Sequence, residues 1–351
     1  MKIRNTWLLS ILICFGLALS LGCAPQTDVA PAAETPADAT AAAEPEAQEV
    51  PIPKGYASEA EIMQAFGAGQ LNLIAENPPI PDEVKSVPDV EYFNVDGNSL
   101  KLDLYLPRES KGAVPALVFI HGGGWSGGNR KDYAPYTIEF ARRGYVTASI
   151  SYRLRGVALY PACVKDVKCA IKFLRANAEK YGIDPNRIAA LGGSAGGHLS
   201  MMIGYAAGAP EFDQGCFPDV SDAVQAVVDL YGPTDLTTPF ARTHGTVTSF
   251  IGQPYEAAMG AYVQASPITW VNAGDPPTLI FQGTIDTLVT PDQSDLLADK
   301  LKATGIDYVY EKYEGWPHTM DKAQPVFERT KYVIDKFMKK HLGGPTPAPA
   351  K

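Results

Sequence analysis

The chain has 351 residues, of which 46% are hydrophobic and 20% charged, the composition of an ordinary globular protein. Its formal net charge is −9 and it contains no long basic run, which excludes a nucleic-acid-binding surface as the basis of its function. It has no Cys-x-x-Cys pair and no histidines paired at ligand spacing, so we expect no metal site and assign no cofactor.

Residues 1–22 have the features of a bacterial export signal. Two basic residues precede a mostly apolar run, 7–21, which is short for a membrane-spanning helix of about 20 residues. The stretch "SLGC" (20–23) resembles the lipobox of bacterial lipoproteins, although serine stands where leucine is usual. The resemblance implies lipidation of Cys23 and, with Ala24 following it, an outer-membrane anchor facing the periplasm or the cell surface. A plain secreted protein and an uncleaved anchor are the alternatives.

Two segments outside the predicted domain lack the apolar side chains needed for a core. Residues 23–55 are dominated by Ala, Pro, Glu and Thr, and we predict a solvated tether there. Residues 343–351 have a similar composition, and we predict a flexible tail there. Between them we predict one catalytic domain, 56–342, in which one or two helices within 57–77 make 56–87 a candidate cap.

Alternating strands and helices are predicted from about residue 88 onward. The predicted strands are 100–107, 115–121, 145–152, 187–193, 223–232, 278–283 and 307–315, and the predicted helices are 134–144, 163–182, 197–207 and 294–305. Strands separated by helices of this length predict an α/β fold with a mostly parallel central sheet and helices on both faces. Ligands of such folds bind beyond the carboxyl ends of the strands.

Three cysteines fall within the predicted domain, namely Cys163, Cys169 and Cys216. An odd number in an oxidising compartment leaves at least one thiol unpaired. The first two lie on one predicted helix and point in different directions, so a bridge would join Cys216 to one of them. We favour buried free thiols over such a bridge.

The stretch "GGSAG" (192–196) lies where a predicted strand turns into a predicted helix. A serine nucleophile must project from a strained turn of this kind, and side chains on its neighbours would collide with the adjacent strand and helix. The pattern Gly-x-Ser-x-Gly therefore makes Ser194 the candidate nucleophile. A tight packing turn without chemistry is the alternative.

A serine hydroxyl needs a base, and the base must itself be oriented by an acid. In this architecture the chain order is nucleophile, acid, base. His121 precedes the serine, His198 lies one helical turn beyond it, His244 has no acid at a preceding strand end, and His341 borders the tail. His318, after the last predicted strand, is therefore the predicted base.

Asp286 is the predicted acid, because it lies in the loop after the strand 278–283 and before His318. An aspartate there would fix the tautomer of the imidazole and stabilise its protonated form. Asp235 is the rival and lies one strand earlier. A turn-forming aspartate without catalytic function is the alternative for Asp286.

The stretch "HGGGW" (121–125) follows the strand 115–121 and presents successive backbone N–H groups without side chains. Such donors stabilise the negative charge that develops on a carbonyl oxygen during acyl transfer. The N–H of Ala195, directly after the serine, is expected to be another donor. A flexible glycine loop is the alternative.

Taken together, these motifs resemble the α/β-hydrolase superfamily and, within it, esterases of the bodipy-feruloyl-esterase-like and hormone-sensitive-lipase-like branch. The resemblance spans about residues 88–340. It is carried chiefly by "HGGGW" (121–125), "SYRL" (151–154), "GGSAGGH" (192–198), "DPPTLIFQGTIDTLV" (275–289) and "GWPH" (315–318).

The resemblance implies an α/β-hydrolase fold and ester hydrolysis through an acyl-enzyme, with the serine, aspartate and histidine in the roles predicted above. By the family's pattern, the oxyanion-hole donors are the backbone N–H groups of Gly123, Gly124 and Ala195. Hormone-sensitive-lipase-like members usually carry an acidic residue before the serine, where this chain has Gly193. This departure favours the feruloyl-esterase-like branch.

The expected function is that of a serine carboxylesterase acting on small acyl or aryl esters, with acetyl or feruloyl esters of carbohydrates among the candidates. Trp125 and Trp316 flank the predicted site and are candidate substrate contacts, although tryptophan also fills cores. An amidase or peptidase with the same triad is an alternative, but a peptidase of this fold usually has a large gating domain. A non-catalytic binding module is disfavoured because the serine, acid and base are all present.

Overall fold

The computed structural model describes residues 49–345. The predicted export signal, Cys23 and the greater part of the predicted tether lie outside the described residues, as do the last residues of the predicted tail. Within the described part of the chain, no helix is both long and apolar enough to span a membrane.

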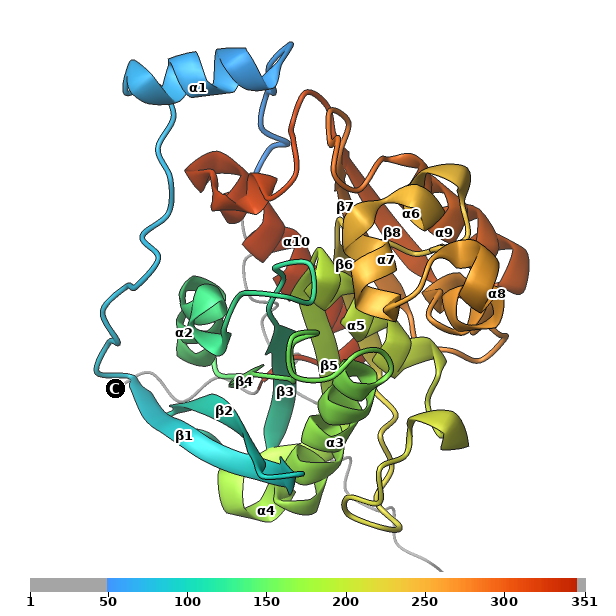
Figure 1. Ribbon diagram of the computed structural model, residues 1–351. Coiled ribbons are helices and arrows are strands. Elements are labelled where there is room, and N and C mark those ends of the chain that lie inside the picture. The colour runs from blue at the N-terminus through green and yellow to red at the C-terminus, as the bar shows by residue number, and fades with distance from the viewer. Residues whose placement is uncertain (1–48, 346–351) are drawn as a thin grey trace, which may run out of the picture. The chain divides into compact units, whose positions relative to one another are not determined.

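Within residues 49–345, the strands form one eight-stranded sheet (Figure 1). They are β1 (Val84–Val95), β2 (Asn98–Pro107), β3 (Val114–Ile120), β4 (Val146–Ile150), β5 (Ile183–Gly193), β6 (Ala226–Leu230), β7 (Thr278–Gly283) and β8 (Tyr308–Tyr313). Their order across the sheet is β1-β2-β4-β3-β5-β6-β7-β8. Only the β1–β2 and β2–β4 pairs are antiparallel. The predicted mostly parallel sheet is therefore confirmed.

Helices precede, connect and follow the strands. They are α1 (Glu59–Gly67), α2 (Ala134–Arg142), α3 (Ala162–Ala176), α4 (Ala178–Tyr181), α5 (Ala195–Tyr205), α6 (Pro239–Thr243), α7 (Gly245–Ile251), α8 (Tyr255–Gln264), α9 (Asp292–Thr304) and α10 (Gln324–Leu342). Short 3₁₀ helices occupy Arg130–Tyr133, Pro210–Phe212, Pro267–Thr269 and Met320–Lys322. The order of strands and helices along the chain is that of an α/β fold.

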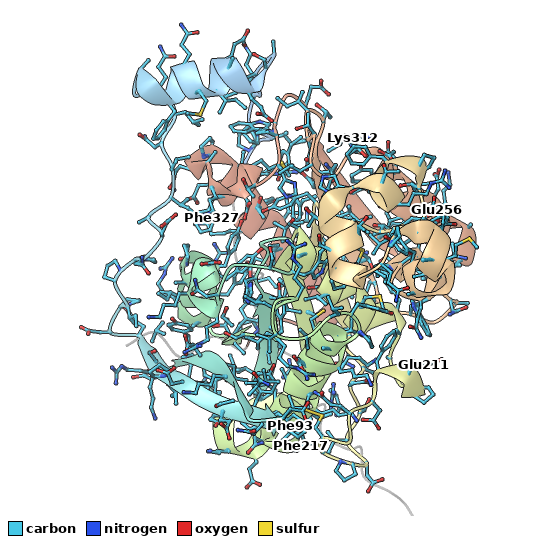
Figure 2. The ribbon with its side chains drawn as sticks, in the orientation of Figure 1. Phe93, Glu211, Phe217, Glu256, Lys312 and Phe327 are labelled. Atoms are coloured by element: carbon cyan, nitrogen blue, oxygen red, sulfur yellow. A yellow bond between two sulfur atoms is a disulfide. The ribbon has the colours of Figure 1, made fainter. Side chains whose placement is uncertain are left out.

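The sheet is buried on both faces, and every residue of β3, β4, β6 and β7 is buried. Side chains alternate along β3, so Val118 packs with α3 and α5 on one face, while Phe119 packs with α2 and α10 on the other. On that second face Phe327 of α10 lies with its ring centroid 4.7 Å from that of Tyr136 on α2 (Figure 2). The helices of these two layers hold the sheet between them, and the loops at its carboxyl edge extend from this packed core.

Three parts of the fold were not predicted from the sequence. The edge strand β1 has only two buried residues and no clean alternation, so its pattern is weak. The short helices α6 to α8 lie between β6 and β7, where the sequence reads as irregular. Helix α10 does carry apolar residues at helical spacing, and this signal was missed beside its many charges. The candidate cap contains one helix, α1, followed by irregular chain.

The expectation of free thiols is wrong for two of the three cysteines in the domain. Cys169 on α3 forms a disulfide with Cys216, with their Cα atoms 6.0 Å apart, and Figure 2 draws the bond in yellow. Cys163 is free and buried. The segment around Cys216 returns to α3 through tertiary packing, which periodicity along the chain does not reveal.

Candidate active site

Ser194 occupies the turn between β5 and α5. Its backbone has φ 57° and ψ −122°, a strained conformation for a residue with a side chain. The turn is held in place because the Ser194 N–H donates to the Leu230 carbonyl on β6 at 2.8 Å and the Ser194 carbonyl accepts from the His198 N–H at 3.0 Å. The serine is thereby raised at the carboxyl edge of the sheet, as predicted for a nucleophile.

The glycines around Ser194 are required by close approach of backbone to backbone. A Cβ added at Gly196 would lie 1.9 Å from the carbonyl oxygen of Ile120 on β3, and one added at Gly192 would lie 2.5 Å from the carbonyl carbon of Gly196. Both distances are shorter than any contact a methyl group tolerates. The small residues therefore let α5 begin directly against the end of β3.

His318 and Asp286 lie together, although they are far apart in the sequence. His318 Nδ1 is 2.6 Å from Asp286 Oδ2. The other carboxylate oxygen, Oδ1, accepts the backbone N–H groups of Leu288 at 2.9 Å and Val289 at 3.0 Å. With a carboxylate as its partner, Nδ1 carries the proton of the neutral imidazole, and Nε2 is left as the basic nitrogen.

The structure does not bring Asp235 to this site. Its Oδ1 accepts the backbone N–H of Thr237 at 2.8 Å and the hydroxyl of the same residue at 2.6 Å, which closes a local turn. Of the two aspartates considered, only Asp286 therefore contacts His318.

Ser194 and His318 line the same pocket, which has a volume of about 510 Å³. The glycine loop forms another part of its wall through Gly122, Gly123 and Gly124. A Cβ added at Gly122 would lie 3.4 Å from the Cβ of Ser194, so the loop lies close beside the serine. The four separate motifs of the sequence thus converge on one cavity.

The glycine loop has a backbone that residues with side chains rarely adopt. Gly123 has φ 103° and Gly124 has φ 58°. The Gly123 carbonyl accepts the N–H groups of Ser126 and Gly127, each at 3.0 Å, which curls the loop into a compact turn. Ala195 lines the pocket and is the first residue of α5, where a helix leaves its N–H groups without intrahelical acceptors. The three predicted oxyanion-hole residues therefore all face the cavity that holds Ser194.

The other histidines occupy different environments. His121 is stacked on Tyr152 with ring centroids 4.3 Å apart, and burial lowers the pKa of its imidazole. His198 is buried, its Nε2 lies 2.7 Å from the Ala265 carbonyl, and burial lowers its pKa to about 4. Both are neutral packing residues at neutral pH. His244, which the sequence placed only in an irregular region, lines the pocket.

The two candidate substrate-contacting tryptophans have different positions. Trp125 lines the pocket and is stacked on Phe250, with ring centroids 4.1 Å apart. Trp316 is 1% exposed, belongs to the core cluster beneath α10, and donates its indole N–H to the Pro53 carbonyl. The prediction of a substrate contact is therefore wrong for Trp316, because that side chain fills the core.

A buried carboxylate beside the pocket, Asp321, has no motif in the sequence that predicts it. Asp321 accepts hydrogen bonds from the hydroxyls of Tyr136, at 3.1 Å, and Tyr231. Burial raises the pKa of Asp321. The ring of Tyr231 packs edge-on against His318 with centroids 4.7 Å apart, so this cluster supports the imidazole from the side. The cluster joins residues from three separate segments, so no local motif in the sequence predicts it.

The sheet order, with a serine on the turn after β5 and a histidine after β8, defines an α/β-hydrolase. More narrowly, the chain belongs to the BD-FAE family, whose model matches residues 102–301. The matched region contains Ser194 and Asp286 and ends before His318.

Several of the named relatives are esterases. The chain is 32% identical to the probable carboxylic ester hydrolase LipM of Mycobacterium tuberculosis, over 68% of this chain and 58% of that protein. It is 31% identical to the esterase LipQ of the same organism, over 79% of this chain and 66% of that protein. The chain thus spans less than two thirds of the length of either relative.

Solved structures of similar fold carry related names. A truncated form of a carbohydrate esterase from gut microbiota superposes with a TM-score of 0.65 at 28% identity, over 76% of this chain and 99% of that one. A butyrate-bound esterase from Thermogutta terrifontis superposes with a TM-score of 0.65 at 27% identity, over 78% of this chain and 98% of that one.

Proposed function

We propose that this protein is a serine carboxylesterase that hydrolyses small acyl or aryl esters through an acyl-enzyme. The observation that carries the proposal is the 2.6 Å contact between His318 Nδ1 and Asp286 Oδ2 at the edge of the pocket that Ser194 lines. The esterase names of the relatives support the same class of reaction.

In the proposed first half-reaction, the Ser194 hydroxyl oxygen bonds to the ester carbonyl carbon and its proton passes to His318 Nε2. The carbonyl oxygen becomes an oxyanion that accepts hydrogen bonds from the N–H groups of Gly123, Gly124 and Ala195. The tetrahedral intermediate then expels the alcohol, which takes the proton from the imidazolium. Asp286 stabilises the imidazolium without taking its proton.

In the second half-reaction a water molecule replaces the alcohol. His318 Nε2 takes a proton from the water as its oxygen bonds to the acyl carbon. The second tetrahedral intermediate collapses, the bond to the serine oxygen breaks, and that oxygen regains a proton from the imidazolium. The products are a carboxylic acid and the unchanged enzyme.

The pocket supports a small acyl or aryl substrate. Much of its wall is apolar, with Trp125, Val247, Phe240 and Leu288 among its members, and an apolar wall suits an alkyl or aromatic group. We propose acetyl or feruloyl esters of carbohydrates as natural candidates, which the name of the gut carbohydrate esterase supports. Trp125 lines the pocket but is 3% exposed and already stacked on Phe250, so we propose it as an edge contact in the wall rather than as an open stacking surface.

The decisive test compares Ser194→Ala with the parent protein. The parent is expected to hydrolyse p-nitrophenyl acetate and butyrate, to leave the matching anilides almost untouched, and to be labelled by a fluorophosphonate. Ser194→Ala is expected to lose both hydrolysis and labelling. Rapid anilide cleavage would favour the amidase alternative, and absence of labelling in the parent would favour a binding module. Acetylated xylan and methyl ferulate then separate the natural candidates.

We further propose that the protein is exported and anchored in the outer membrane through lipidated Cys23. The support is the sequence "SLGC" (20–23) with Ala24 after it. A bacterial host fed a radiolabelled fatty acid is expected to label the protein, which should sediment with outer membranes. Cys23→Ala should lose the label and the membrane association, and a labelled Cys23→Ala protein would contradict the proposal.

A further inference from the structure

Two segments that are distant in the sequence lie against each other beside the pocket. We call residues 49–76 the N-terminal arm and residues 314–324 the base loop, because the latter carries His318 between β8 and α10. The arm and the base loop both lie outside residues 102–301, which the BD-FAE family model matches. The contacts of the arm with the base loop flank His318 on both sides along the chain.

The first contact lies just before His318. The backbone N–H of Tyr56 donates to the Gly315 carbonyl at 3.1 Å, and the indole N–H of Trp316 donates to the Pro53 carbonyl at 3.2 Å. The ring of Tyr56 meets that of Trp316 edge-on, with centroids 5.5 Å apart and planes at 83°. A Cβ added at Gly315, whose φ is 71°, would lie 2.3 Å from the Tyr56 carbonyl oxygen, so the two backbones touch.

The second contact lies just after His318. Leu73 forms an antiparallel bridge with Ala323. Around it the Ile74 N–H donates to the Lys322 carbonyl at 2.9 Å, and the Gln324 N–H donates to the Asn72 carbonyl at 2.8 Å. The arm thus pairs with the base loop through one isolated antiparallel bridge, and Ile74, next to this bridge, lines the pocket.

The opposite side of the base loop is bonded to the loop that carries Asp286. The Ile285 N–H donates to the Trp316 carbonyl at 3.2 Å, and the Gly315 N–H donates to the Thr284 hydroxyl at 2.8 Å. Trp316 therefore lies between the arm and the residue next to Asp286. Trp316 is thus bonded to the arm through its side chain and to the Asp286 loop through its backbone carbonyl.

We propose that the N-terminal arm is a positioning element for His318 and that Ile74 completes the pocket wall. The inference rests on the proposed function, because it assigns a role in that reaction. Tyr56 acts through Trp316 and does not touch the substrate. A misplacement of a catalytic group by about 1 Å can lower the rate by about 10²-fold, so the packing of one ring is expected to be measurable.

The test of the first contact is Tyr56→Ala in the full chain. We expect kcat for p-nitrophenyl acetate to fall ~10-fold or more with KM nearly unchanged, because the base is misaligned while the pocket remains. Tyr56→Phe should keep the parent kcat, since the Tyr56 hydroxyl forms no hydrogen bond within the described residues. Met63→Ala is the matched control, because Met63 lies on the arm and is 66% exposed.

A double-mutant cycle separates positioning from general destabilisation. In the His318→Ala background, Tyr56→Ala is expected to leave the residual kcat unchanged, because there is no imidazole left to align. A proportional loss in both backgrounds, or a parent-like kcat for Tyr56→Ala, would overturn the proposal. Circular dichroism and thermal unfolding confirm that each variant is folded. If Tyr56→Ala does not fold, Tyr56→Leu replaces it with the same expected outcome.

The second contact is tested with Ile74→Ala. We expect KM for p-nitrophenyl butyrate to rise several-fold with kcat retained, since an apolar wall residue is shortened. An unchanged KM would show that Ile74 does not contribute to substrate binding. The two proposals can fail separately, because a parent without Ser194-dependent hydrolysis refutes the esterase, whereas an active parent with an active Tyr56→Ala variant refutes only the role of the arm.

Discussion

Asp286 and Asp235 show how one contact distinguishes two similar residues. Asp286 holds His318 while its second oxygen accepts two backbone N–H groups, whereas Asp235 only closes a turn. We expect Asp286→Asn to lower kcat by about 10²–10⁴-fold, because the amide no longer fixes the imidazole tautomer. Asp235→Asn should change kcat by less than about 3-fold. Steady-state kinetics of both variants measure the difference, and the reverse ranking would exchange their roles.

His198 makes the stability of the fold depend on pH. Burial lowers its pKa to about 4 in the folded chain, against an ordinary value of 6.5. The unfolded imidazole therefore gains a proton as the pH falls below 6.5, while the folded one does not until about pH 4. The stabilisation is complete above this window and is lost within it, by about 1.4 kcal/mol per pH unit.

The measurement is urea unfolding of the parent and of His198→Gln at pH 7 and at pH 5. The parent is expected to lose more unfolding free energy between the two pH values than the variant, because glutamine does not titrate. His121, whose pKa is also lowered by burial, contributes equally to both proteins. Equal losses would show that His198 takes up its proton without unfolding.

At the scale of elements, the turn between β5 and α5 can form only with glycine at position 196, because the backbone of β3 lies against it. A Cβ at Gly196 would lie 1.9 Å from the Ile120 carbonyl oxygen, whereas one at Gly260 on α8 would meet nothing within 4 Å. Gly196→Ala is expected to abolish fluorophosphonate labelling of Ser194 or to prevent folding. Gly260→Ala should keep full activity and raise the unfolding free energy by about 0.5–1 kcal/mol. Normal labelling of Gly196→Ala would contradict the packing argument.

The disulfide joins α3 to the segment that precedes β6. Cys169 and Cys216 are 47 residues apart in the sequence, and neither lines the pocket. Replacing both by alanine is expected to lower the unfolding free energy by about 2–4 kcal/mol, because the unfolded chain is no longer cross-linked. The kcat should stay within about 2-fold of the parent value. Thermal unfolding measures the change in stability and steady-state kinetics measure kcat. Cys163→Ala is the matched control, because Cys163 is not in a disulfide.

On the scale of the whole molecule, the described residues, 49–345, contain every group that the proposed reaction uses and the whole N-terminal arm. A protein beginning at Glu49 is therefore expected to keep the kcat/KM of the full chain for soluble aryl esters. Kinetics of both proteins measure this. A loss greater than about 10-fold would mean that residues 1–48 contribute to the active site.

The sequence alone was enough to predict strands β2 to β8 and the strand-to-helix turn at Ser194, because these follow from local periodicity and small-residue patterns. The choice of His318 followed from the chain order of nucleophile, acid and base in this architecture. Local patterns failed for Trp316, which the sequence placed near the site and the structure places in the core. They failed also for the Cys169–Cys216 bridge.

What only the tertiary structure decided are the contacts between segments far apart in the chain. The support of Asp321 by Tyr136 and Tyr231, and the pairing of the N-terminal arm with the base loop, join elements with no local sequence signal in common. Such contacts depend on how the layers pack. Periodicity reports which side of an element is buried, but not which distant residue covers it.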